Sequence, residues 1–277
     1  MKIFITGATG FIGSNFINKA LSEGNEVIAL RRSKKSKPKV ELNKNPYWLT
    51  KKLEEVEEKD LIGVEVVVHF AAHSMSPPYD TLENSIYWNV IAPLKLFRNA
   101  VAAGVEKFVI AGSCFEYGLS GDNYEFIPSN APLIPTISYA VSKASASMAF
   151  FQFAIEKQLK LSIHRIFHVY GPGEAEYRFW PSLKQAAESG SDFPMTNGEQ
   201  VRDFIHVDIV VQKFYDLCEN NNLESGKPII ENLGTGNSTT VLEFAKFWWK
   251  KWNAKGQLLI GEIPHREGEI MRYVPKI

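Results

Sequence analysis

Tyr139 and Lys143 lie four residues apart in the segment SYAVSKASASMAF, which has a helical pattern and follows a Pro-rich loop. Side chains at this spacing share one face of a helix. A tyrosine with an ordinary pKa near about 10 exchanges protons poorly at neutral pH, and a nearby lysine can lower that pKa. The pair is therefore a candidate for proton transfer.

Ser113 precedes Tyr139 by 139 − 113 = 26 residues and follows the apolar run KFVIAG. If this run is a strand of a parallel sheet, Ser113 stands at its carboxyl end, where such sheets bind ligands. A Tyr-x-x-x-Lys pair by itself is most often an exposed helix pair. Ser113 and a glycine-rich loop in the same chain make the combination specific.

That glycine-rich loop lies in the N-terminal segment MKIFITGATGFIG, where an apolar strand leads through Gly7, Gly10 and Gly13 into a helix. Glycines at this spacing allow a tight turn, a close approach of backbone amides to a pyrophosphate, and helix packing on the strand. A glycine-rich turn without a ligand would look similar. The position at the first strand of a βαβ unit favours a dinucleotide site.

The second strand indicates which dinucleotide is preferred. NAD(H) sites usually end this strand with an acid, whereas NADP(H) sites place arginine there for the 2′-phosphate. Here VIAL continues into Arg31, Arg32 and Ser33, so NADP(H) is favoured and NAD(H) stays possible. The alternative is that these arginines, with the lysines of the same basic run, form only a solvated loop.

The elements around these residues predict an α/β fold. Nearly continuous apolar runs predict strands at 2–6, 26–30, 64–70, 107–112 and 161–166. Strands of this kind, alternating with amphipathic helices, are typical of a Rossmann-type, doubly wound parallel sheet. We expect residues 1–170 to form the dinucleotide-binding domain, with later segments such as 202–235 returning to it. Residues 171–277 should form mainly a smaller C-terminal substrate-binding lobe, with helices near 180–189, 208–220 and 239–252.

The composition is that of an ordinary globular protein, with 277 residues, 31 Lys+Arg and 31 Asp+Glu. A neutral chain is a poor nucleic-acid binder, and no apolar run approaches the roughly 18 residues of a membrane helix. Without an N-terminal signal pattern, we expect a cytoplasmic protein with neither nucleic-acid nor membrane partners. Cys114 and Cys218 have no metal-ligand spacing, so no metal site is expected.

The chain resembles the extended short-chain dehydrogenase/reductase family of nucleotide-sugar epimerases, dehydratases and ketoreductases over almost its whole length. The motifs that carry the resemblance are TGATGFIG, VVHFAA, SCFEYG, YAVSK, VYGPG, NGEQVRDFIHV, NLGTG and REGE. In motif it is closest to reductases of nucleotide-linked 4-keto-6-deoxyhexoses.

The resemblance implies a role for each matching residue. Tyr139 would exchange a proton with a sugar oxygen that Ser113 also binds, and Lys143 would hold the nicotinamide ribose and lower the tyrosine pKa. The residues expected to bind the dinucleotide are Gly7, Thr9, Gly10, Phe11, Ile12, Gly13, Arg31, Arg32, Phe70, Ala71, Ala72, Asn89, Tyr139, Lys143 and Val169. Those expected to bind a nucleotide-diphosphate sugar are Ser113, Glu116, His168, Arg202 and Arg266, the two arginines at the diphosphate.

Departures from the family pattern narrow the function. Dehydratases place an acid one or two positions after the strand-end serine, where this chain has Cys114 and Phe115. Glu116 resembles the ketoreductase form, although a buried or loop glutamate is an equal alternative. His168 stands where asparagine is frequent, with a packed strand histidine as the alternative, and Ile209 replaces the second acid of a Val-Asp-Asp motif.

We therefore expect NADPH-dependent reduction of the C4 keto group of a nucleotide-linked 4-keto-6-deoxy sugar. The alternatives are an NAD-dependent nucleotide-sugar 4-epimerase and, more distantly, a non-catalytic dinucleotide-binding protein. The resemblance also implies a homodimer through helices near 80–103 and 137–157. Relatives commonly continue beyond the position of Arg266, so we expect the second lobe to be short or truncated. The stripe Phe244, Trp248 and Trp252 should be core packing, with a partner surface as the alternative.

Overall fold

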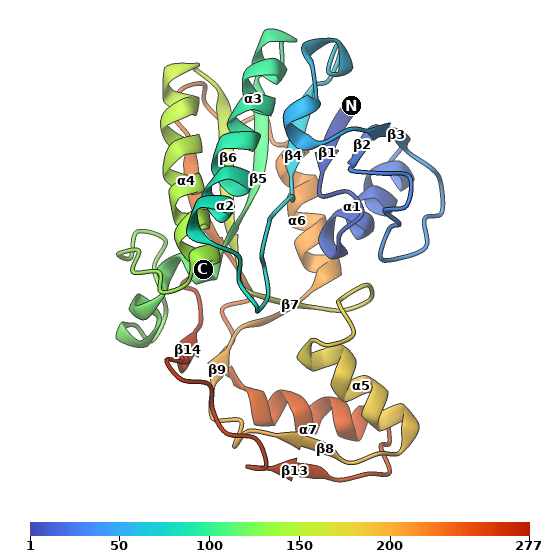
Figure 1. Cartoon of the computed structure of the whole chain (residues 1–277), viewed down its shortest axis with the longest axis vertical. Coiled ribbons are helices and arrows are strands. Elements are labelled where there is room, and N and C mark those ends of the chain that lie inside the picture. The colour runs from blue at the N-terminus through green and yellow to red at the C-terminus, as the bar shows by residue number, and fades with distance from the viewer.

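A seven-stranded parallel sheet forms the centre of the computed structural model, which describes residues 1–277 (Figure 1). The strand order is β11-β6-β5-β4-β1-β2-β3, and every neighbouring pair is parallel. The strands are β1 Lys2–Thr6, β2 Glu26–Arg31, β3 Tyr47–Thr50, β4 Val66–His69, β5 Lys107–Ser113, β6 Lys160–Ile166 and β11 Ile229–Leu233. The order reverses after β1, and this change of direction creates the crevice in which such sheets bind ligands.

Helices cover both faces of the sheet, as the apolar strands predicted. Consecutive strand residues point to opposite faces, so Ile3 and Ile5 belong to one buried core and Phe4 to the other. The first core lies under α1 and α6, and the second under α3 and α4 (Figure 1). The helices are α1 Phe11–Ser22, α2 Leu82–Ile86, α3 Ala92–Ala102, α4 Ser138–Glu156 and α6 Val207–Glu219, with a π-helical turn η3, Tyr87–Ile91, between α2 and α3.

The five predicted strands are present, with bounds shifted by at most two residues. Strands β3 and β11 at the two sheet edges were not predicted. Edge strands are short and partly solvated, so they lack the continuous apolar run of the inner strands. Short 3₁₀ helices link the elements: η1 Leu53–Glu55, η2 Glu58–Asp60, η4 Cys114–Tyr117 and η5 Leu119–Asn123.

A second lobe lies beyond the carboxyl ends of the strands (Figure 1). Its elements are β7 His168–Tyr170, α5 Phe179–Ser189, β8 Phe193–Met195, β9 Val201–Arg202, β10 Phe204–His206, β12 Thr239–Thr240, α7 Val241–Lys251, β13 Leu258–Ile260 and β14 Arg272–Tyr273. Phe244 and Trp248 of α7 contact Tyr170, and Trp252 contacts Trp180. The aromatic stripe is thus core packing inside this lobe. No helix is both long and apolar enough to span a bilayer.

Candidate active site

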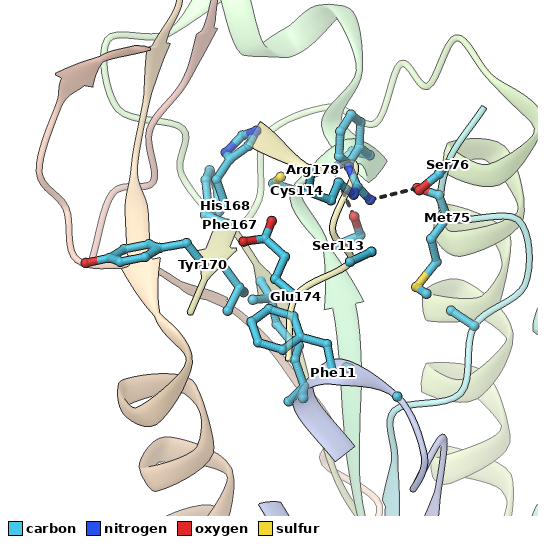
Figure 2. A pocket seen from close by; sticks show the side chains of 18 of the residues that line it. Phe11, Met75, Ser76, Ser113, Cys114, Phe167, His168, Tyr170, Glu174 and Arg178 are labelled. Atoms are coloured by element: carbon cyan, nitrogen blue, oxygen red, sulfur yellow. Dashed lines mark hydrogen bonds between the residues drawn. The ribbon is translucent and has the colours of Figure 1, made fainter. Parts of the chain in front are cut away.

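A pocket of about 370 Å³ opens at the carboxyl ends of the inner strands, between the sheet and the second lobe (Figure 2). The predicted site residues that line it are Gly7, Gly10, Phe11, Ile12, Gly13, Phe70, Ala72, Ser113, Tyr139, Lys143, His168 and Val169. Residues far apart in the sequence therefore meet in one cavity, because parallel strands end at the same edge of the sheet.

The glycine loop has the shape that a dinucleotide pyrophosphate requires. Gly7 has φ +65°, and a Cβ there would lie 2.6 Å from the backbone nitrogen of Ala71. A Cβ at Gly13 would collide with the carbonyl of Gly7. Gly10 caps α1 without a side-chain hydrogen bond, and the first turn of α1 holds no acid. The N–H groups of this turn are thus available to an anion, so the loop fits the cofactor.

Arg31 is the last residue of β2, and its side chain is held in place from β3. Its Nε donates to Thr50 Oγ1 at 3.1 Å, and its guanidinium carbon lies 4.9 Å from the centre of the Trp48 ring. Its terminal nitrogens have no protein partner, and the neighbouring Arg32 is exposed. Two arginines therefore stand where a carboxylate would bind a ribose.

Ser113, Tyr139 and Lys143 are all buried, at the end of β5 and in the first turns of α4. Lys143 Nζ donates to the carbonyl of Ala111 at 2.7 Å, which fixes the helix against the strand. Burial raises the pKa of Tyr139, which a hydrogen bond from Ser113 and the charge of Arg178 partly offset. The sequence predicts that Lys143 lowers this pKa. Instead burial prevails and keeps the phenol protonated, and burial also lowers the pKa of Lys143 itself.

Glu116 does not reach the pocket, contrary to the expected substrate contact. It is fully buried, and its Oε1 accepts from the Ser113 backbone N–H at 2.9 Å. Its Oε2 accepts from Arg165 Nε at 2.7 Å and from Ser147 Oγ at 2.8 Å. Both carboxylate oxygens of Glu116 thus have protein partners, and one of them fixes the backbone of Ser113.

Asn89 lies in the π-helical turn and outside the pocket lining. Its Oδ1 accepts from the His73 backbone N–H at 2.7 Å, and its Nδ2 donates to Ser142 Oγ at 2.8 Å. Ser142 in turn donates to the carbonyl of Tyr139. Asn89 therefore connects the loop after β4 to the helix that carries Tyr139. Thr9 and Ala71 likewise flank the pocket without lining it.

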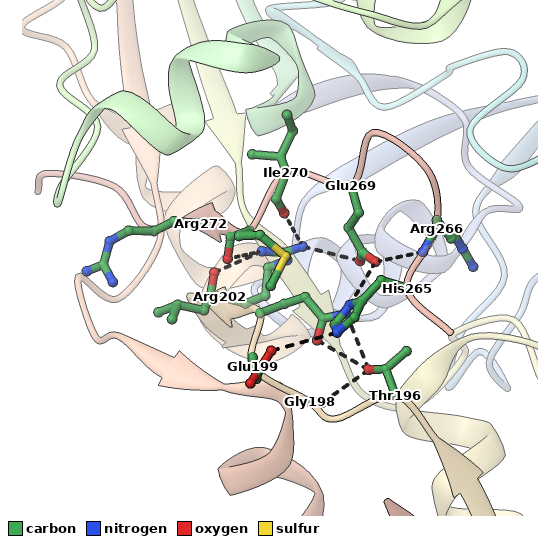
Figure 3. A network of polar contacts seen from close by, with 12 residues as sticks. Thr196, Gly198, Glu199, Arg202, His265, Arg266, Glu269, Ile270 and Arg272 are labelled. Carbon is green, nitrogen blue, oxygen red and sulfur yellow. Dashed lines mark hydrogen bonds and ion pairs between the residues drawn. The ribbon is translucent and has the colours of Figure 1, made fainter. Parts of the chain in front are cut away.

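Arg202 and Arg266 also lie outside this pocket, in the loop network that Figure 3 shows. Arg202 is buried, and its guanidinium donates to the carbonyls of Val201, Met271 and Ile270. Its Nη2 also lies 3.6 Å from Glu269 Oε1. Arg266 is exposed, and its backbone N–H donates to Glu269. The guanidinium of Arg202 therefore binds the C-terminal segment around residues 269–271 and is not free for a diphosphate.

His168 lines the pocket and is packed at the same time. Its ring contacts Phe115, Phe204 and Tyr273, and its Nδ1 has no hydrogen-bond partner. Burial and two nearby arginines hold the pKa of His168 well below its ordinary value. The imidazole is therefore neutral, and its Nδ1 is free to bind a ligand among the surrounding aromatic rings.

Two charged residues of the pocket were missed from the sequence. Glu174 follows the Gly171-Pro172-Gly173 turn, and burial raises its pKa to about 7. Arg178 reaches across the pocket, and its Nη2 donates to the carbonyl of Met75 at 3.2 Å (Figure 2). The available signal was a charged pair just after the strand-end VYGPG motif, but only the tertiary structure places it at the cavity.

Known proteins resemble this chain in sequence and structure. A profile of the NAD-dependent epimerase/dehydratase family matches residues 3–234. The UDP-glucose 4-epimerase of Corynebacterium glutamicum is 29% identical over 265 residues, covering 87% of this chain and 77% of the relative. The CDP-abequose synthase of Salmonella typhimurium is 26% identical over 274 residues, covering 97% and 87%. The structure of MoeE5 in complex with UDP-glucose and NAD has a TM-score of 0.85 at 25% identity, covering 100% and 90%.

Proposed function

This chain belongs to the NAD-dependent epimerase/dehydratase family, and we propose that it reduces the C4 keto group of a nucleotide-linked 4-keto-6-deoxy sugar with NADPH. It is an NAD(P)-dependent, nucleotide-sugar-modifying enzyme of that family. The finer assignment concerns the direction of the reaction and the choice of cofactor. It depends most on one observation, the arginine that ends β2.

Arg31 supports the phosphorylated cofactor because its guanidinium is oriented and still unsatisfied. Stacking on Trp48 and the hydrogen bond to Thr50 fix the side chain, and its terminal nitrogens keep their donors for a phosphate. NADPH is the cofactor that a reductase consumes, whereas an epimerase regenerates its own cofactor and commonly uses NAD. Cofactor preference thus carries information about the reaction.

The side chains around Ser113 fit proton donation to a reduced ketone. The bound cofactor would supply hydride to C4. Ser113 would hold the ketone oxygen by a hydrogen bond, and Tyr139 would deliver its phenolic proton to that oxygen as it becomes an alkoxide. The raised pKa of Tyr139 keeps this proton in place at neutral pH, as a donor requires. Lys143 would orient the nicotinamide ribose and stabilise the phenolate left behind.

The acid that dehydratases place directly after the strand-end serine is missing here. Burial raises the pKa of the Cys114 thiol to about 12, and Phe115 presents only a ring to the pocket. Glu116 is committed to Arg165 and to the Ser113 backbone. None of the three residues after Ser113 can therefore protonate a departing hydroxyl.

A 4-epimerase is the second candidate, and two observations favour it. The relative from Corynebacterium glutamicum is named UDP-glucose 4-epimerase, and MoeE5 was solved with NAD. Such an enzyme would use the same Ser113, Tyr139 and Lys143. A non-catalytic dinucleotide-binding protein, the third alternative, would have no need of the three together.

An isotope experiment separates these candidates. The purified protein is incubated with NADPH that carries deuterium at the transferable position of its nicotinamide. The substrates are a panel of GDP-, dTDP-, CDP- and UDP-linked 4-keto-6-deoxy sugars. We expect one NADPH consumed per sugar and deuterium at C4 of the product. Interconversion of two 4-hydroxy sugars with no added cofactor, and NAD released only on denaturation, would replace the reductase assignment by the epimerase.

We also propose that two copies associate through the helices on the α4 side of the sheet. Leu82 of α2, Ile91 of η3, and Met148 and Ile155 of α4 are exposed apolar side chains on this side. Apolar surface of this kind supports a protein interface. A dimer in light scattering that Met148→Glu converts to a monomer would support the assembly, and a monomeric unmodified protein would contradict it.

A further inference from the structure

Glu174 is a carboxyl group of the pocket for which C4 reduction has no use. In Figure 2 its side chain extends from the loop after β7 into the cavity, near Ser113 and His168. Its Oε2 is cut off from solvent and has no hydrogen-bond partner. A buried polar oxygen without a partner is costly, and in a pocket a bound ligand can supply the missing donor.

The loop that carries Glu174 has a fixed shape. Gly171 has φ +136° and Gly173 has φ +91°, both in the region that side chains rarely adopt. A Cβ at Gly173 would lie 2.8 Å from Val40 Cγ1, and the carbonyl of Pro172 accepts from Asn15 Nδ2 at 3.0 Å. The direction of Glu174 is therefore imposed by the turn and by its contacts with α1 and the loop after β2.

The surroundings of Glu174 select the kind of group that it can bind. A phosphate would be repelled by the carboxylate, and Arg178 is the neighbouring cation that moderates the cost of its charge. The ketone oxygen of the substrate is assigned to Ser113 and Tyr139, both of which are donors, so it needs no acid at Glu174. Glu174 lines the same cavity as Ser113 and Tyr139, so the sugar end of the substrate lies nearest to it, and a hydroxyl of the sugar ring is a donor that suits a carboxyl acceptor.

We propose that Glu174 accepts a hydrogen bond from a ring hydroxyl of the sugar and so determines which nucleotide sugars the enzyme takes. This inference rests on the proposed function, because that function places a hydroxyl-bearing sugar in the pocket. It assigns the reacting oxygen to Ser113 and Tyr139, and the selection of the sugar to the loop after β7. Glu174 is thus a specificity-determining residue, separate from the proton donor.

The test combines removal of the carboxyl with removal of the hydroxyl. Binding of dTDP-, CDP- and UDP-linked 4-keto-6-deoxyglucose is measured by calorimetry, and the tightest ligand is compared with its 2-deoxy and 3-deoxy counterparts. Glu174→Ala should weaken the full ligand by about ten- to a hundredfold. It should have almost no effect on the counterpart that lacks the contacted hydroxyl. Glu176→Gln, an exposed glutamate in the same loop, is the matched control.

Two outcomes would overturn the proposal. One is that Glu174→Ala, with an unchanged melting temperature, loses the same affinity for all three ligands or loses none. The other is a selective loss of NADPH affinity, which would assign the carboxyl to the cofactor. Glu174→Gln keeps the side-chain shape and one carbonyl acceptor. It should therefore lose less affinity for the full ligand than Glu174→Ala does, and the two variants should not differ for the counterpart that lacks the contacted hydroxyl. Because binding is measured, a protein that binds these sugars without reducing them contradicts the proposed function and leaves this test intact.

Discussion

Glu116 and Arg165 form a buried ion pair, 2.7 Å between Oε2 and Nε, and the other carboxylate oxygen of Glu116 accepts from the Ser113 backbone N–H. The pair comes from the turn after β5 and from β6, so it joins the two strands that end at the pocket. Arg165 also donates to Tyr117 Oη and to the carbonyl of Ser129. The side chain that resembled a substrate contact in the sequence is therefore part of the support of the active site.

Removal of Glu116 should destabilise the whole fold. In Glu116→Ala the buried guanidinium of Arg165 loses its counter-charge, at a cost of about 3–5 kcal/mol in the free energy of unfolding. Urea denaturation measures this loss, with Glu125→Ala in an exposed loop as the control. A variant of normal stability whose only defect is a raised KM for the sugar would restore Glu116 to the substrate site.

The arginines at the end of β2 should set the cofactor preference. NADPH should bind more tightly than NADH, and Arg31→Ala with Arg32→Ala should remove most of that preference while NADH binding is kept. Loss of charge-assisted hydrogen bonds of about 1.5–3 kcal/mol corresponds to one to two orders of magnitude in Kd. Fluorescence titration measures both constants, with Lys34→Ala and Lys35→Ala as the control. Equal affinities in the unmodified protein would contradict the preference.

Tyr139 should be essential for turnover and dispensable for cofactor binding. Tyr139→Phe keeps the buried ring and removes the transferable proton, so kcat should fall by about 10²-fold or more. Lys143→Ala should weaken both turnover and dinucleotide binding, because it removes the ammonium group that would hold the nicotinamide ribose and stabilise the phenolate. Steady-state kinetics and calorimetry measure the two effects. Nearly full activity in Tyr139→Phe would show that another group donates the proton.

Glu174 should make stability depend on pH near neutrality. Its pKa rises from 4.5 to about 7 on folding, so between these values the folded state binds more protons than the unfolded state. Stability from this group is complete below pH about 4.5, falls as the pH rises through about 7, and then levels off. Glu174→Gln has no such loss. The free energy of unfolding of Glu174→Gln, relative to that of the unmodified protein, should therefore rise by up to about 3 kcal/mol from pH 5 to pH 8. Solvent that reaches the carboxyl makes this difference smaller.

Chemical denaturation at several pH values measures this difference. Other charged and titratable groups line the same pocket: Arg178 on its own segment, His168 on β7, and Tyr139 and Lys143 on α4. Burial raises the pKa of Tyr139 above this window, and the pKa of His168 is held well below its ordinary value. A variant that follows the unmodified protein in parallel at every pH would contradict a buried Glu174.

The local features of this protein were determined by its sequence alone. The inner strands could be predicted because burial on both faces requires an uninterrupted apolar run. The glycine loop and the Tyr139–Lys143 pair could be predicted because a tight turn and one helical turn are set by residues close in the chain. The position of Ser113 followed from the same logic, since a strand end is a local property.

Only the tertiary structure decided which polar side chains face the cavity. Glu116 and Glu174 both follow a strand, β5 and β7, yet Glu116 is paired with Arg165, whereas Oε2 of Glu174 has no hydrogen-bond partner in the pocket. Arg202 matched a diphosphate position, but three backbone carbonyls occupy its guanidinium. Such differences depend on partners dozens of residues away, so no local pattern records them. A charged side chain is directed by its nearest counter-charge or donor, and packing alone determines which one that is.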